Sequence, residues 1–312
     1  MLPVLESGEE TLVGGQAVME GVMMRAPHSY CVAVRKPNGE IVTEESPLPK
    51  LSEKYPLFKY PILRGVGTLG HAMYLGVKAL RFSANAALEE ENKTSETKQD
   101  ISGWAMSLNL LFSFAFFIFL YKFVPLWLTT ALGDRYPALK GQIAFNLVDG
   151  VIRIAIFLAF LYGISRWKDI HRVFEYHGAE HKVVFNFESG APVTVENAQR
   201  FVTFHPRCGT SFLLVVMVIS MIVYAFLPIE SFAGKFASRI ALLPVIAGLS
   251  YEMIRFAARR RGSLMATLTA PGLWLQRITT QNPSDDQTAV AIHALEGAMR
   301  IEQQQGGPLV IA

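Results

Sequence analysis

The chain has 312 residues, of which 51% are hydrophobic and only 18% are charged, and its mean hydropathy is +0.29. Soluble proteins carry charges at about a quarter of their positions, so this composition argues against an ordinary soluble enzyme and favours an integral membrane protein. The formal net charge of +3 gives no reason to expect a nucleic-acid-binding protein.

The N-terminal residues 1–56 are predicted to form a cytosolic segment of short strands and turns. Residues 31–34 and 41–43 are β-prone and flank the sequence Lys-Pro-Asn-Gly at 36–39, which is typical of a hairpin. The N-terminus itself is acidic and has no basic, then apolar, segment, so no cleavable signal peptide is expected.

A glycine-rich run at 14–25 carries three isolated polar residues, Gln16, Glu20 and Arg25. The simpler interpretation is a buried turn and strand with an ion pair between Glu20 and Arg25. The alternative is that the three side chains form one wall of a cytosolic site. The run is not a phosphate-binding loop, because no Gly-Lys-Ser/Thr follows it.

Residues 57–88 combine glycines with interspersed lysines and arginines, which predicts an interfacial or re-entrant helix. The polar residues 89–103 are expected to form a linker.

The expected fold is mixed and mainly α-helical, a polytopic membrane protein with a small cytosolic α+β portion. Residues 104–257 are predicted to form its membrane domain with about four transmembrane helices, at 104–128, 142–164, 210–229 and 232–255. The second span contains Asp149 and Arg153, which are four residues apart and can neutralise each other on one helix face. Basic residues gather in the loop 166–210 and after the last span. The positive-inside rule therefore predicts that this loop and both termini are cytosolic.

The loop 166–210 is expected to begin as a helix, to include a strand-like run at 183–187 and to resume helix after Thr194. The residues 258–312 are expected to form a cytosolic helical tail. It contains an apolar stretch at 264–275, a final helix that begins at Ser284 or Asp285, and a loose end at 303–312. Asp285 and Asp286 are interpreted as the start of that helix rather than as metal ligands.

The loop 166–210 holds the densest set of side chains that could bind a metal or act in catalysis. His177 and His181 are four residues apart and share a helix face with Glu180, and a His and a Cys follow at His205 and Cys208. Three histidines and one cysteine would complete a tetrahedral zinc site, whereas two histidines and one glutamate with an open position would make a catalytic site. Glu180 can ligate the metal or act as a base on bound water. A hydrogen-bonded polar cluster without metal is the alternative. Glu252, at the cytosolic end of the fourth span, is a further candidate ligand.

Several strings together resemble one family. They are GGQAVMEGVMMR at 14–25, YHGAEHK at 176–182, FHPRCGTSF at 204–212 and APGLWLQRITT at 270–280. The chain resembles the YqhQ family of bacterial integral membrane proteins, which has carried the description of predicted metal-dependent enzymes. The resemblance implies a site at His177, Glu180, His181, His205 and Cys208, and location in the bacterial cytoplasmic (inner) membrane. It implies no particular reaction.

Three functions are therefore carried forward. The first is a metal-dependent membrane hydrolase, with a divalent metal such as zinc and a substrate near the cytosolic face. The second is a non-catalytic assembly or scaffold protein with a structural metal or polar cluster. The third is a small-solute transporter, which only the Asp149/Arg153 pair supports and which would require a homo-oligomer to form a pathway. The lipid bilayer is the one partner that the sequence predicts.

Overall fold

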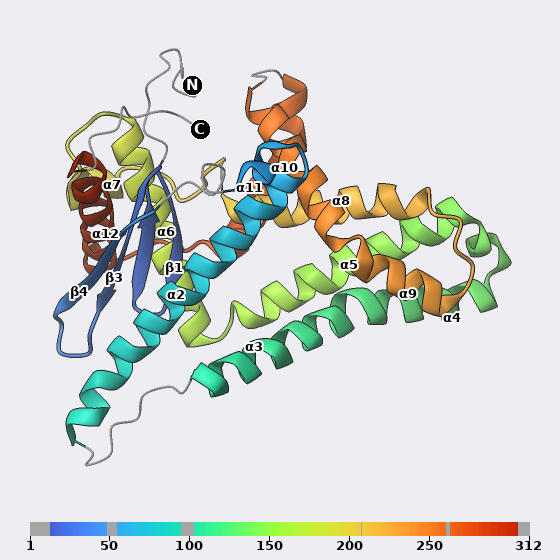
Figure 1. Ribbon diagram of the computed structural model, residues 1–312, viewed down its shortest axis with the longest axis horizontal. Coiled ribbons are helices and arrows are strands. Elements are labelled where there is room, and N and C mark those ends of the chain that lie inside the picture. Colours follow the sequence, from blue (N-terminus) through green and yellow to red (C-terminus); the bar gives the residue numbers. More distant parts are fainter. Residues whose placement is uncertain (1–12, 49–54, 95–102, 207, 260–262, 305–312) are drawn as a thin grey trace.

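The computed structural model describes residues 13–48, 55–94, 103–206, 208–259 and 263–304 (Figure 1). The start of the N-terminal segment (1–12), residues 95–102 of the expected linker and residues 305–312 of the expected loose end lie outside these ranges. The chain forms a mainly helical molecule with one small antiparallel sheet, as predicted.

The sheet is a four-stranded meander in the order β1-β2-β3-β4, and two elements link it to the rest of the chain. Its strands are β1 (Gly14–Val18), β2 (Gly21–Arg25), β3 (Ser29–Arg35) and β4 (Ile41–Pro47). A short turn, η1 (Pro56–Lys59), then leads into the long helix α2 (Leu63–Thr94).

The remaining elements are helical. They are α3 (Gly103–Ile118), the π-helical turn η2 (Phe119–Phe123), α4 (Val124–Arg135), η3 (Pro137–Lys140), α5 (Gln142–Ile164), α6 (Lys168–Glu188), α7 (Val195–Gln199), α8 (Gly209–Ala225), α9 (Phe232–Ala241), α10 (Leu243–Arg259), α11 (Ser263–Thr279) and α12 (Asp285–Gln304).

The apolar helices lie together in an elongated bundle, in which α5 packs against α4 and α8, and α8 also contacts α10 and α11 (Figure 1). Among the described residues, two stretches are long and apolar enough to cross a membrane, Ser107–Arg135 and Gln142–Ile164. The pair α9 and α10 passes the same test only when both helices are taken together as one span, and it is bent by 51°; α8 is apolar but shorter. These helices indicate membrane association, and the four-span topology remains a prediction.

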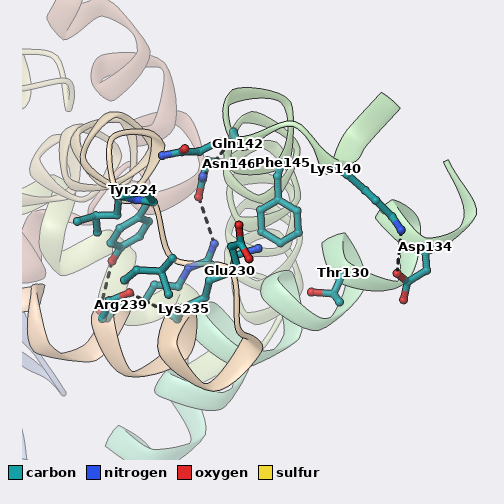
Figure 2. Close-up of a pocket in the computed structure, with 15 residues that line it drawn as sticks. Thr130, Asp134, Lys140, Gln142, Phe145, Asn146, Tyr224, Glu230, Lys235 and Arg239 are labelled. Atoms are coloured by element: carbon teal, nitrogen blue, oxygen red, sulfur yellow. Dashed lines mark hydrogen bonds and ion pairs between the residues drawn. The ribbon is translucent and has the colours of Figure 1, made fainter. Parts of the chain in front are cut away.

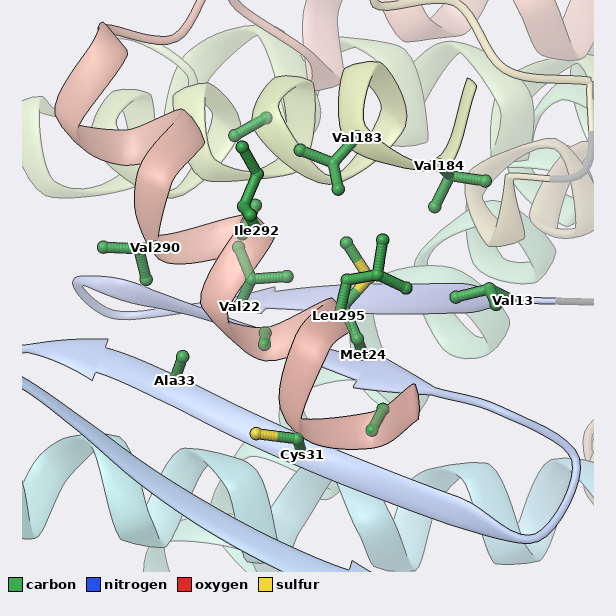
Figure 3. Packing of buried hydrophobic residues seen from close by; sticks show 14 of the residues in the cluster. Val13, Val22, Met24, Cys31, Ala33, Val183, Val184, Val290, Ile292 and Leu295 are labelled. Atoms are coloured by element: carbon green, nitrogen blue, oxygen red, sulfur yellow. The ribbon is translucent and has the colours of Figure 1, made fainter. Parts of the chain in front are cut away.

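The sheet is covered on both faces, which explains why the two central strands, β2 and β3, are buried along almost their whole length. Figure 3 shows α12 lying across the strands with α6 beyond it. One face, with Val22, Met24, Cys31 and Ala33, packs against these two helices. Tyr30, Val32 and Val34 of β3 face the other way, onto α2. The alternation follows the two-residue period of a strand.

Local signals in the sequence explain the elements that were predicted correctly. The β3–β4 hairpin closes at 36–39, where Gly39 has a φ of +89° that glycine adopts at little cost. At the start of α12, the Ser284 hydroxyl accepts from the Gln287 backbone N–H, and the Gln287 side chain accepts from the Ser284 N–H. This is a capping box. The Thr194 side chain likewise caps α7.

Three expectations were wrong. Residues 183–187 are helical rather than strand-like, because Val183 and Val184 bury their branched side chains on the helix face that packs against the sheet. The expected linker is helical as far as Thr94, since α2 continues into it. Glu20 does not pair with Arg25; its carboxylate binds Arg172 on α6 instead.

Candidate metal centre

Helix α6 carries His177, Glu180 and His181, and glycine at position 178 lets another segment approach it closely. A Cβ at Gly178 would lie 1.9 Å from the backbone oxygen of Gln281, so only glycine fits there. The Gln281 N–H in turn donates to the Phe174 carbonyl at 2.9 Å. This crossing brings the C-terminal end of α11 against the histidine-bearing face of α6.

Backbone carbonyls orient both imidazole rings. His177 Nδ1 lies 2.7 Å from the Thr279 carbonyl oxygen, and His181 Nδ1 hydrogen-bonds to the Thr203 carbonyl oxygen. A carbonyl can only accept a hydrogen bond, so Nδ1 must carry the proton in each ring. In the neutral imidazole each Nε2 is then left with a free lone pair. Metal-binding histidines are commonly held in this way.

Cys208 supplies a third donor atom at the same place. Its Sγ lies 3.2 Å from His177 Nε2 and 3.1 Å from Thr210 Oγ1. One ligand atom from each of His177, His181 and Cys208 lies within 4.8 Å of the others. Cys208 also directly precedes α8, where it is the N-cap residue.

His205 lies beside this group and is not part of it. Its ring centroid is 5.5 Å from that of His181, while its Nε2 is 3.5 Å from Glu188 Oε2. Burial lowers the pKa of His205, and the nearby Glu180 carboxylate opposes this shift. Of the four predicted metal ligands, three come together and His205 flanks them.

Glu180 lies directly next to the three donors. It is buried, and its Oε2 is 3.4 Å from His181 Nε2. Its Cγ packs against Gly15 of β1, where a Cβ would approach within 2.7 Å. The N-terminal glycine run thus forms one wall of the centre, through Gly15 rather than through its polar residues.

The other predicted site residues lie elsewhere. Gln16 points to the opposite side of the sheet and contacts α2 at Gly76. Arg25 lies near Tyr251 of α10, and burial lowers the pKa of its guanidinium. Glu252 accepts two hydrogen bonds from Arg64, at 3.1 and 2.5 Å.

The Glu20 carboxylate ties the β1–β2 turn to α6. It binds Arg172 and accepts from the Tyr176 hydroxyl at 3.2 Å. Burial and the neighbouring Glu20 carboxylate both raise the pKa of Tyr176. Glu20 therefore fixes the helix that carries the donors without reaching them.

Three residues that position the centre were not predicted: Thr203, Gln276 and Thr279. The fully buried Gln276 of α11 accepts from the His205 N–H at 2.7 Å and donates to the His205 carbonyl at 2.8 Å. An isolated amide in the apolar sequence GLWLQ was the available signal. Thr203 and Thr279 act through backbone carbonyls, for which no side-chain signal exists.

The donor set suits a particular chemistry. Two imidazole nitrogens and one thiolate, with a fourth position open, are typical of catalytic zinc sites. The carboxylate of Glu180 is close enough to act as a further ligand or as a base. The residues present therefore fit a divalent transition metal.

Comparison with known proteins places the chain in a family. Residues 60–301 match the family described as "Protein of unknown function (DUF1385)". The chain is also 35% identical over 298 residues to "Uncharacterized protein YqhQ" of Bacillus subtilis (strain 168), which covers 93% of this chain and 92% of that protein. No solved structure matches the chain. The chain belongs to the YqhQ (DUF1385) family.

Proposed function

We propose that this protein is a metal-dependent membrane hydrolase whose active site lies at the cytosolic face of the bacterial cytoplasmic membrane. One observation carries the proposal. Two histidines on α6 are held by backbone carbonyls so that both Nε2 atoms are free to bind a metal together with Cys208 Sγ. A purely structural polar cluster has no need for two imidazoles fixed in the same tautomer.

Each residue has a distinct role in this proposal. His177, His181 and Cys208 would hold the cation, and the mixed nitrogen and sulfur donors favour zinc. A bound zinc ion would supply Lewis-acid activation of a water molecule and of a scissile carbonyl or phosphoryl group. Glu180 would accept the proton released by the attacking water, since its carboxylate lies within 3.4 Å of a ligand ring.

The membrane topology is part of the proposal. Four spans, at 104–128, 142–164, 210–229 and 232–255, would place both termini and the α6–α7 region in the cytosol, where the positive charge gathers. Cys208 directly precedes the third span, so the centre would lie at the membrane surface. A lipid headgroup or a membrane-proximal peptide is the substrate class that this position favours.

The role of Glu180 can be tested with purified, zinc-loaded protein in vesicles of bacterial total lipid, to which a peptide mixture is added. We expect mass spectrometry to detect a hydrolysis product with the wild type and with Glu196→Gln, a control at an exposed α7 carboxylate that pairs with Arg200. Glu180→Gln should retain zinc and yield no product. Equal product from Glu180→Gln, or none from the wild type, would refute the hydrolase.

A scaffold role with a structural metal is the second candidate. The donors and the carbonyls that orient them come from α6, the segment before α8 and the end of α11, so a bound ion would hold three separate segments together. In that case chelation and Cys208→Ala should each lower the melting temperature. Glu180→Gln should then leave both the stability and the cellular role of the protein unchanged.

A further inference from the structure

A second polar cluster is buried in the helical bundle, at the end opposite the metal centre. Asp149 of α5 accepts a hydrogen bond from Arg239 Nη1 at 2.6 Å and another from Arg153. Lys122, in the π-helical turn η2, lies nearby, with Nζ 3.5 Å from the Tyr224 hydroxyl. All four charged side chains are at most 9% exposed. Turns of this kind inside α-helices are frequent at functional sites.

The charges of this cluster do not balance. Two guanidiniums, which remain protonated in proteins, share the single carboxylate of Asp149, and the Lys122 amine beside them hydrogen-bonds to the Tyr224 hydroxyl. The Tyr224 ring lies between the cations, 5.7 Å from Lys122 Nζ and 5.3 Å from the Arg239 guanidinium carbon, and offsets part of the excess. Buried positive charge in excess of the available negative charge is costly, so an additional anion would stabilise the cluster.

A cavity of about 550 Å³ opens beside this cluster, between the ends of α4, α5 and α8 and the start of α9 (Figure 2). Tyr224, Arg239, Lys235 and Asn146 line the cavity. Lys122 and Arg153 belong to the buried cluster and are not among the cavity's lining residues. Figure 2 shows the Arg239 side chain reaching from α9 toward Asn146. The volume is in the range of small-molecule and cofactor sites.

Basic side chains outnumber acidic ones in the lining of the cavity. Lys140, Lys235 and Arg239 line it, against Asp134, which lies 3.9 Å from Lys140, and the exposed Glu230. Arg239 is also paired with Asp149, so Lys235 is the cavity-lining cation of α9 that is not held in a buried ion pair.

We infer that this cavity binds a phosphate group through Lys235 and Arg239, and that the buried Lys122 and Arg153 complement its charge. Arginine and lysine together are the usual ligands of phosphate oxygens. The phosphate can belong to a lipid headgroup or to a soluble phosphate ester. The inference does not depend on the metal centre, because α8 separates the two sites by about 25 Å, its 17 residues rising about 1.5 Å each.

The test measures thermal unfolding of the delipidated protein in a neutral detergent, by tryptophan fluorescence. The probes are sodium phosphate against sodium chloride at equal ionic strength, and micelles that contain phosphatidylglycerol or phosphatidylcholine. The variants are Lys235→Gln and Lys122→Met. The control is Arg135→Gln, at an exposed arginine near the cavity that does not line it.

A ligand that binds only the folded state raises the melting temperature. We expect a phosphate-bearing probe to do so in the wild type and in Arg135→Gln, with the apparent affinity about tenfold lower in Lys235→Gln. Lys122→Met should raise the melting temperature of the unliganded protein and abolish the shift.

The pattern across the probes identifies the source of the phosphate. A shift with either phospholipid but not with inorganic phosphate supports the inference with a lipid headgroup, whereas a shift with inorganic phosphate supports it with a soluble ester. No shift beyond that of chloride, or equal shifts in all variants, would overturn the inference.

Discussion

Replacing Gln276 by methionine isolates the contact that positions His205 and Cys208. The Gln276 side chain hydrogen-bonds to both the N–H and the carbonyl of His205. Methionine of similar volume would break both bonds; the carbonyl would keep the bond from the Cys208 N–H at 3.3 Å, whereas the N–H would lose its acceptor. An unsatisfied buried N–H costs about 1–3 kcal/mol, so we expect a loss of stability of that size. At about 2–4 °C per kcal/mol, the melting temperature should fall by about 2 °C or more.

The assay is thermal unfolding in detergent, followed by zinc analysis of the folded fraction. Gln142→Met is the matched control, since Gln142 is exposed and makes a single side-chain bond, to the Ala225 carbonyl at 2.7 Å. That variant should stay within about 0.5 kcal/mol of the wild type. A melting temperature for Gln276→Met equal to that of the control would refute the reasoning that Gln276 holds the His205 backbone.

Three further substitutions test other parts of the structure by thermal unfolding. Gly178→Ala should cost about 1–3 kcal/mol, because its Cβ would lie 1.9 Å from a loop oxygen, whereas Gly163→Ala, with nothing within 4 Å, should stabilise its helix by up to about 1 kcal/mol. Equal effects would contradict the close approach. Burial opposes ionisation of Glu302, but hydrogen bonds led by those from His28 outweigh it and hold the Glu302 pKa below its ordinary value of 4.5. Its contribution to stability should therefore be complete above pH 4.5 and be lost as the pH falls through the folded-state pKa; Glu302→Gln should remove this dependence. Asp149→Asn should destabilise the bundle by about 3–5 kcal/mol, since it leaves two buried guanidiniums without their carboxylate, and a near-native melting temperature would argue against the shared pair.

The elements that could be predicted from the sequence are those specified by residues close to one another in the chain. The β3–β4 hairpin and the start of α12 follow from turn and cap residues that act within a few positions, at Gly39 and Ser284. Residues 183–187 were predicted to be strand-like because branched and aromatic side chains favour strands, yet they are helical. Their burial between α6 and the sheet depends on contacts with distant segments, which override that preference.

The sequence predicted the side chains that make up the candidate centre. It did not predict the contacts that orient these side chains. His177 and His181 follow from helical spacing, but the carbonyls of Thr203 and Thr279 that orient them are backbone atoms without a residue signature. The pairing of Glu252 with Arg64 joins residues 188 positions apart, and nothing in the local sequence favours it over metal binding.

The most direct test of the metal centre is elemental analysis of the purified protein. We expect about one zinc per chain in the wild type and in His171→Ala, a control at an exposed histidine on α6 that lies outside the three-donor group. His177→Ala and Cys208→Ser should each lose most of the metal. A wild type without bound transition metal, or equal metal in His177→Ala, would contradict the metal centre on which the proposed function rests.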